Sequence, residues 1–156
     1  MRRILLLFFL LPSFLFAQLR IGVRFYPHFS AEGLFGEKKY SVFLIEFLNT
    51  GKEPLRIGEN FLLITSEGRK YRPRPAPWLR KEIRDRFGIR EKFIWIGRLP
   101  PGERRTKIVV FNPIPEDCQE VTLYIFGLSP GKILLITFRK QGEERWRETV
   151  RRWKRR

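Results

Sequence analysis

Apolar segments with a period of two residues, separated by glycine- and proline-containing turns, constrain the fold of this chain more than any other feature. From Leu19 to Tyr26 the odd positions are apolar and the even positions are Arg, Gly, Arg and Tyr, which is typical of a half-buried strand. We expect Pro27 to end this strand. The segment Tyr40–Leu48 is apolar on both faces apart from Glu46, which predicts a central strand.

Further short runs of β-branched and aromatic residues follow at turn-separated intervals. Strands are expected at Leu55–Ile57, Phe61–Thr65, Lys92–Ile96, Thr106–Phe111, Val121–Phe126 and Ile133–Phe138. A chain with this many strands and little helix has to bury its sheet faces against each other. The pattern therefore predicts an all-β antiparallel sandwich or barrel.

The segment 73–88 interrupts the strand pattern. Three prolines within residues 73–77 favour a stiff extended linker. In Trp78–Phe87, Leu79, Ile83 and Phe87 share one face of a helix, and Gly88 is placed to end it. We therefore predict a Pro-rich linker followed by a short helical insertion.

The C-terminal segment 142–156 has a different pattern. Trp146, Val150 and Trp153 are spaced i, i+4, i+7, with Glu residues before them and most of the Lys and Arg residues after them. This spacing predicts a basic amphipathic C-terminal helix, whose stripe docks on the β-domain or on a partner.

The first 17 residues resemble a secretory signal sequence. Arg2 and Arg3 precede a mostly apolar run, and Ala17 stands before Gln18. The run is shorter than the ~20 residues that span a bilayer. We expect cleavage after Ala17 and an exported protein, periplasmic or extracellular. An uncleaved membrane anchor is the alternative, because Leu15 stands where cleavage sites have a small residue.

Positive charge is concentrated in two segments. The formal net charge of the 156 residues is +16, from 32 Lys+Arg and 16 Asp+Glu. Segment 69–92 carries ten Lys+Arg and three Asp+Glu, and segment 139–156 carries nine and three. Removing Arg2 and Arg3 with the signal sequence leaves +14, of which these segments supply +13. Arg-rich surfaces also occur where ion-pair networks give heat resistance.

Catalytic and metal-binding residue types are scarce. One Cys and one His cannot form an internal disulfide or a structural zinc site, and we expect no cofactor. His28 has no nucleophile and orienting acid near it in sequence, so we expect an edge side chain rather than a catalytic base. Cys118 has no base nearby, which favours a small half-buried residue over a reactive thiol. These observations argue against an enzyme.

Two turn sequences carry a family resemblance. Asn49-Thr50-Gly51 is followed by Pro54-Leu55, and Leu99-Pro100-Pro101-Gly102-Glu103 is followed by a strand that ends in Phe111. These turns resemble those of small secreted bacterial immunoglobulin-like domains. The resemblance implies an immunoglobulin-like antiparallel β-sandwich over residues 18–141, with an accessory, adhesion or binding role. The insertion 73–88 and the missing disulfide depart from the simple pattern.

Two functions follow from these features. The first is an exported, non-enzymatic immunoglobulin-like module that binds or braces another component of the bacterial cell envelope. The second is a binder of an anionic membrane surface or polyanion, with segments 69–92 and 139–156 forming one basic face. Export argues against nucleic acid as the partner. The candidate contact residues are Arg72, Arg74, Trp78, Arg80, Lys81, Arg84, Trp146, Arg147, Arg151, Arg152, Trp153 and Lys154.

The expected cleavage is directly testable. The protein isolated from its host should begin at Gln18, because the charged, apolar and small-residue regions are in the order that signal peptidase requires. Intact-mass measurement checks this, and a mass that retains Met1–Ala17 would refute it.

Overall fold

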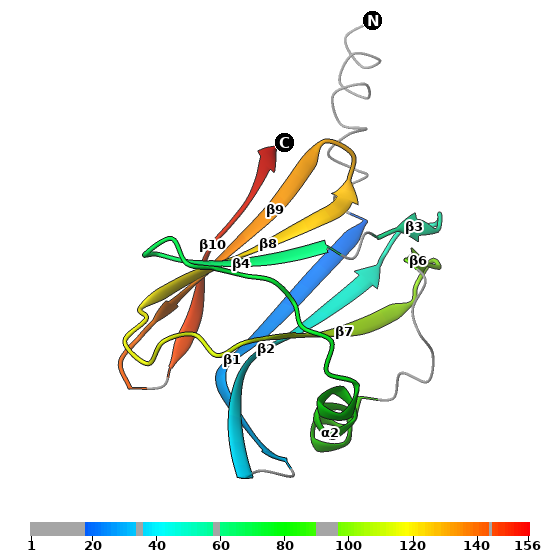
Figure 1. The fold of residues 1–156 in the computed structure, drawn as a ribbon. Helices are drawn as coiled ribbons and strands as arrows, with labels where there is room; N and C mark the ends of the chain where they lie inside the picture. The colour runs from blue at the N-terminus through cyan, green and yellow to red at the C-terminus, as the bar shows by residue number, and fades with distance from the viewer. Residues whose placement is uncertain (1–17, 34–35, 58–59, 90–96, 144) are drawn as a thin grey trace, which may run out of the picture.

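The computed structural model describes residues 18–33, 36–57, 60–89, 97–143 and 145–156, and its secondary structure is mostly antiparallel β (Figure 1). This confirms the all-β prediction. The predicted signal sequence and the predicted strand Lys92–Ile96 lie outside the described residues. The elements are β1 (Leu19–Gly33), β2 (Gly36–Asn49), β3 (Leu55–Arg56), β4 (Asn60–Thr65), β5 (Lys70–Tyr71), α2 (Pro77–Phe87), β6 (Arg98–Leu99), β7 (Arg104–Phe111), β8 (Glu120–Ser129), β9 (Lys132–Lys140) and β10 (Trp146–Arg155).

The strands form two main sheets and one small one. The three-stranded sheet has the order β1-β2-β7, and the five-stranded sheet has the order β10-β9-β8-β4-β5. β3 and β6 pair separately. All of these pairings are antiparallel.

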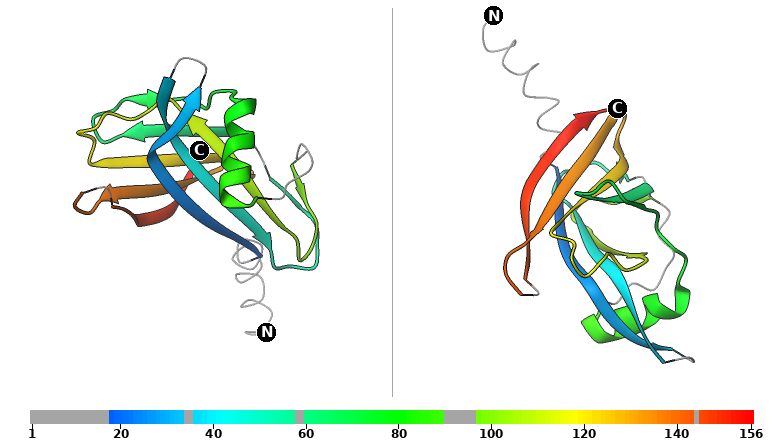
Figure 2. Two further views of the ribbon diagram at one scale, coloured as in Figure 1. Left: turned by 90° about the horizontal axis from the view of Figure 1, so that it is seen from below. Right: turned by 60° about the vertical axis from the view of Figure 1, so that its left-hand side comes forward.

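Strand β2 is buried on both faces, as its sequence predicts. Its side chains Phe43, Ile45 and Phe47 join the larger apolar cluster, to which β4, β8 and β9 of the five-stranded sheet also contribute. Its alternate side chains, among them Val42 and Leu44, join a second cluster that includes helix α2. The three-stranded sheet therefore has the five-stranded sheet on one face and α2 on the other (Figure 2).

The predicted helix is confirmed as α2, at Pro77–Phe87. Leu79 and Ile83 are fully buried against the three-stranded sheet. Gly88 adopts φ 65° and its N–H donates to the Arg84 carbonyl, which ends the helix. Before the helix, the N–H of Arg74 donates to the Val110 carbonyl at 2.8 Å, so the proline-rich linker is held beside β7.

Strand β1 does not end at Pro27, as the sequence suggested. It continues to Gly33, and its register against β2 shifts between Tyr26 and Phe29. A β-bulge at the edge of a sheet tolerates proline, because the missing N–H would point away from the neighbouring strand. β1 is such an edge strand.

The predicted C-terminal helix is wrong. Residues 146–155 form strand β10, which pairs with β9. A register shift between Glu148 and Val150 adds one residue to β10, so Trp146 and Trp153 lie opposite Lys140 and Leu134, on one side of the sheet. Sequence spacing of seven residues, which suits one helix face, therefore also suits one face of a bulged strand.

Tertiary contacts explain why the strand forms instead of the helix. A helix of this length is marginal in water, whereas the edge of β9 offers backbone hydrogen-bond partners on both sides of the bulge. The Trp146 ring also packs edge-on against Phe25 of β1, at a centroid distance of 5.3 Å.

The two turn sequences that carry the family resemblance meet at Asn49. This side chain is fully buried, and its amide donates to the carbonyls of Glu53 at 2.7 Å and Leu99 at 3.0 Å. Its Oδ1 accepts from the Gly51 N–H at 2.9 Å. The Gly102 N–H also donates to the Asn49 carbonyl at 2.8 Å. Asn49 thus joins the turn after β2 to the turn before β7.

Replacing Asn49 with Ala should lower the free energy of unfolding by about 2–4 kcal/mol, since two carbonyls and one N–H in and around the core lose their partner. Chemical denaturation measures this change. Asn60→Ala, at an exposed strand position, is the control and should cost about 0.5 kcal/mol or less. Equal effects of the two substitutions would contradict the role assigned to Asn49.

Candidate binding site at the edge of the three-stranded sheet

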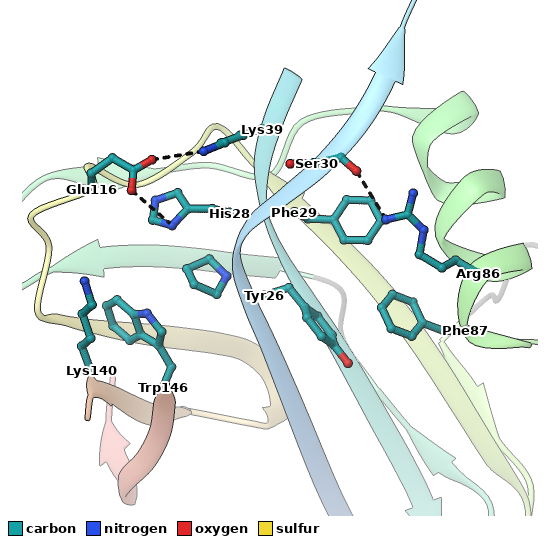
Figure 3. Close-up of a pocket in the computed structure, with 11 residues that line it drawn as sticks. Tyr26, His28, Phe29, Ser30, Lys39, Arg86, Phe87, Glu116, Lys140 and Trp146 are labelled. Carbon is teal, nitrogen blue, oxygen red and sulfur yellow. Dashed lines mark hydrogen bonds and ion pairs between the residues drawn. The ribbon is translucent and has the colours of Figure 1, made fainter. Parts of the chain in front are cut away.

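A cavity of about 510 Å³ lies beside the bulge of β1 (Figure 3). Its volume is in the range of small-ligand sites. It is lined by Tyr26, Pro27, His28, Phe29, Ser30, Lys39, Arg86, Phe87, Glu116, Lys140 and Trp146. These residues come from β1, β2, the end of α2, the loop before β8, and the β9–β10 corner.

The bulge determines which side chains reach each side of β1. Before it, Phe25 packs on the larger cluster and Tyr26 on the helix side. After it, Phe29 packs on the helix side. Figure 3 accordingly shows His28 on one side of β1, with Lys39 and Glu116, and Phe29 on the other.

A buried serine holds the bulge in place. The Ser41 hydroxyl is fully buried, donates to the Pro27 carbonyl at 2.7 Å and accepts from the Ile114 N–H at 2.9 Å. The His28 Nε2 lies 3.1 Å from the Ile114 carbonyl, which requires that nitrogen to carry the proton. Ser41 therefore ties the bulge and the loop that carries Glu116 to β2.

One carboxylate faces two basic groups on the His28 side. Glu116 lies 3.9 Å from His28 Nδ1 and 3.6 Å from Lys39 Nζ. Ser30 also lines the cavity, but within the described residues its hydroxyl makes no hydrogen bond to the His28 ring. This arrangement can hold a polar group.

Aromatic rings and a guanidinium form the helix side. Arg86 lies over the Phe29 ring at 4.5 Å, pairs with Glu82 at 2.9 Å, and donates to the Ser30 carbonyl at 3.3 Å. The Phe87 and Tyr26 rings are 4.9 Å apart. Because these contacts fix Arg86 and Phe87, this wall is pre-formed.

Of the twelve residues predicted from the sequence, Trp146 alone lines this cavity. Arg86, Phe87 and Lys140 belong to the two basic segments but were not singled out, and His28 was expected only at an edge. Glu116, Lys39 and the bulge were missed altogether. Pro27 within an otherwise regular strand pattern was the available signal for the bulge.

The other predicted residues of segment 69–92 lie on or beside α2. Arg74 donates to Asn112 Oδ1 at 2.6 Å and lies over the Tyr40 ring at 5.5 Å. Trp78 is 49% exposed and also faces Tyr40. Arg72, Arg80 and Lys81 are exposed, and Arg84 is half-buried.

The predicted residues of segment 139–156 lie on β10. Arg151 forms two hydrogen bonds with the Glu148 carboxylate and donates to the Ile21 carbonyl of β1. Arg147, Arg152, Trp153 and Lys154 are exposed. Since α2 covers one outer face of the molecule and β10 belongs to the sheet on the opposite side, the predicted residues on α2 do not share a face with those on β10 (Figure 2).

Cys118 is buried, with 5% of its surface exposed, and its thiol donates to the Glu120 carbonyl at 3.4 Å. Burial raises the pKa of the Cys118 thiol above its ordinary value, and nearby carboxylates add to the increase. Within the described chain no group of three or more His, Cys, Asp or Glu residues is arranged to hold a metal ion. No helix among the same residues has the length and apolar character needed to cross a bilayer.

Comparison with known proteins gives little. No protein-family model matches the chain, and no curated protein matches it. A solved structure described as "X-ray structure of Northeast Structural Genomics Consortium target SoR45" shares 12% identity with it. The match covers 88% of this chain and 86% of that one, with a TM-score of 0.38, which is too low to support an inference about fold or ligand.

Native Cys118 should react with iodoacetamide at pH 8 roughly 100-fold more slowly than the unfolded chain, because both burial and the raised pKa reduce accessible thiolate. Mass spectrometry of quenched samples gives both rates, with the same protein in denaturant as the reference. A native rate equal to the unfolded rate or above it would show an activated thiol.

Proposed function

We propose that this chain is an exported, non-enzymatic, immunoglobulin-like module that binds or braces another component of the bacterial cell envelope. The strand order is the observation that carries the proposal. Immunoglobulin sheets contain strands A, B and E on one side and C′, C, F and G on the other. The orders β1-β2-β7 and β5-β4-β8-β9 follow A-B-E and C′-C-F-G, and among the described residues no strand stands in the place of D beside β7.

The proposed sandwich is supported by the shared core. Phe43 and Phe111 come from the three-stranded sheet, and Phe138 comes from the five-stranded sheet. The Phe43 ring lies 5.7 Å from each of the other two, edge-on to both.

Two additions distinguish this chain from a minimal immunoglobulin-like domain. Helix α2 lies between β5 and β7, and β10 extends the five-stranded sheet beyond β9. The cavity lies where the end of α2 and the start of β10 approach β1. Binding sites in this class are built from loops and edges on a rigid scaffold, so these additions support a ligand site here.

The cavity is suited to a partner that presents an acidic group next to an apolar one. Arg86 and Lys39 are already held by the carboxylates of Glu82 and Glu116. Lys140 has no ion pair among the described residues, and it lines the cavity beside Trp146 (Figure 3). Lys140 can therefore pair with an incoming carboxylate while Trp146 covers an apolar side chain.

Site-specific photo-crosslinking in the native host tests this function. A photoreactive residue at position 30, in the cavity wall, should give one defined crosslinked envelope component. The same residue at position 81, on the exposed face of α2, is the control and should not. Adding Lys140→Glu should reduce the crosslink at position 30 about tenfold, because it reverses a charge in the cavity wall.

Two outcomes would contradict the proposal. One is the same crosslinking pattern from positions 30 and 81, which would indicate random collisions. The other is the absence of any crosslinked partner from position 30 in a folded, correctly located protein.

A further inference from the structure

The outer face of the five-stranded sheet, which points away from the core, carries an apolar centre with cations at both side edges. Strand register places Glu120, Arg139 and Arg147 in a row at one end of this face and its other residues in three further rows. Read from β5 or β4 across to β10, the first of these rows is Lys70, Ile64, Thr122, Thr137 and Val150. The second is Leu62, Tyr124, Leu135 and Arg152, and the third is Asn60, Phe126, Ile133 and Lys154. The alternate residues of these strands, such as Leu63, Leu123 and Ile136, form the core.

The centre of this face is apolar and partly exposed to solvent, although Leu135 in its middle row is 3% exposed. Leu62, Ile64, Tyr124 and Phe126 are half-buried, and neither apolar cluster includes them. Val150 is 48% exposed. These half-buried residues therefore keep part of their apolar surface in contact with solvent.

The rim of this face is cationic. Arg152 and Lys154 stand on β10 at one side, and Lys70 stands on β5 at the other. The Arg156 guanidinium lies 5.9 Å from the Phe126 ring, which brings a further cation to this face. Among the described strand positions of this face, the one acidic residue is Glu120, and its carboxylate is paired with Arg139 at 3.1 Å.

A bilayer with anionic lipids fits both parts of this surface. Its headgroups pair with the cations at the rim, and its interface accepts Tyr, Phe and aliphatic side chains. A soluble polyanion would pair with the same cations but would leave the apolar centre without a partner. The long stems of Arg152 and Lys154 can lie on apolar surface while their charges reach the headgroups.

We infer that the outer face of the five-stranded sheet docks on an anionic lipid surface. The occupant is the lipid bilayer itself, and docking in this orientation directs α2 away from the membrane, since α2 lies on the opposite side of the molecule (Figure 2). The inference rests on the proposed export in one respect, because export determines which membrane the protein meets. Binding to vesicles of defined composition does not depend on the envelope partner, so the two proposals can fail separately.

Co-sedimentation with vesicles tests the inference, using the protein with the N terminus that it carries when isolated from its host. Vesicles of phosphatidylglycerol and phosphatidylcholine at a 3:7 molar ratio should bind it, and vesicles of phosphatidylcholine alone should not. The double variant Arg152→Gln, Lys154→Gln should partition about 30-fold more weakly, which is about fivefold for each cation lost at the surface.

The matched control is the double variant Arg80→Gln, Lys81→Gln. It removes the same charge from exposed positions on α2 and should change partitioning less than threefold. Equal losses in the two double variants would overturn the inference, because net charge rather than this face would then govern binding. Absence of binding to the anionic vesicles at low salt would overturn it as well.

The apolar centre has a separate test. Phe126→Ser should weaken partitioning about tenfold, and Val150→Ser about threefold, at a salt concentration where charge effects are screened. Val150 is exposed, so its replacement leaves the fold intact, and thermal unfolding checks both variants. If neither substitution changes vesicle binding and heparin competes fully with the vesicles, the ligand is a polyanion and the bilayer inference is wrong.

Discussion

The burial of strand β2 on both faces is the constraint on which the rest of the structure depends. Phe43, Ile45 and Phe47 require an apolar layer on one side, and Val42 and Leu44 require another on the other side. A sheet of three strands cannot supply either layer from itself, since its own side chains alternate between the two faces. The five-stranded sheet covers one face, and α2 with Leu79 and Ile83 covers the other. The insertion between β5 and β7 is thus part of the core rather than an appendage.

This arrangement leaves β1 at an edge, and the edge is where the cavity forms. The bulge at Pro27 ends regular pairing, and Ser41 holds the displaced backbone from the neighbouring strand. Along the earlier part of β1, Arg151 of β10 donates to the Ile21 carbonyl, which protects part of the edge. The two sheets therefore approach each other along β1 and β10. The cavity lies beyond this contact, beside the bulge of β1 and Trp146 of β10.

The sequence predicted correctly those elements whose side-chain pattern is compatible with one type of secondary structure. The two-sided apolar run at Tyr40–Leu48 fits only a central strand, and Leu79 and Ile83 followed by Gly88 fit a short helix. The sequence-based prediction was wrong where a β-bulge changed the two-residue period of the side chains along a strand. Trp146, Val150 and Trp153 matched a helix stripe because one added residue in β10 restores the same side for both tryptophans. The cavity could not be predicted, since Glu116, Lys140 and His28 are brought together by the packing of the sheets and not by any spacing in the sequence.

The same packing changes the meaning of the charge. As a sequence, segments 69–92 and 139–156 are two basic additions to a nearly neutral domain. In the fold, the first segment is divided between two places: Lys70 lies on β5 of the five-stranded sheet, whereas other cations lie on or beside α2. Of these, Arg86 is held by Glu82 and the Phe29 ring, and Arg74 lies over the Tyr40 ring. On the outer face of β10, Arg152 and Lys154 stand beside apolar strand residues with no carboxylate in their rows. A cation held by a carboxylate stabilises the protein's own structure, whereas cations beside a partly exposed apolar surface remain available to a ligand outside the molecule.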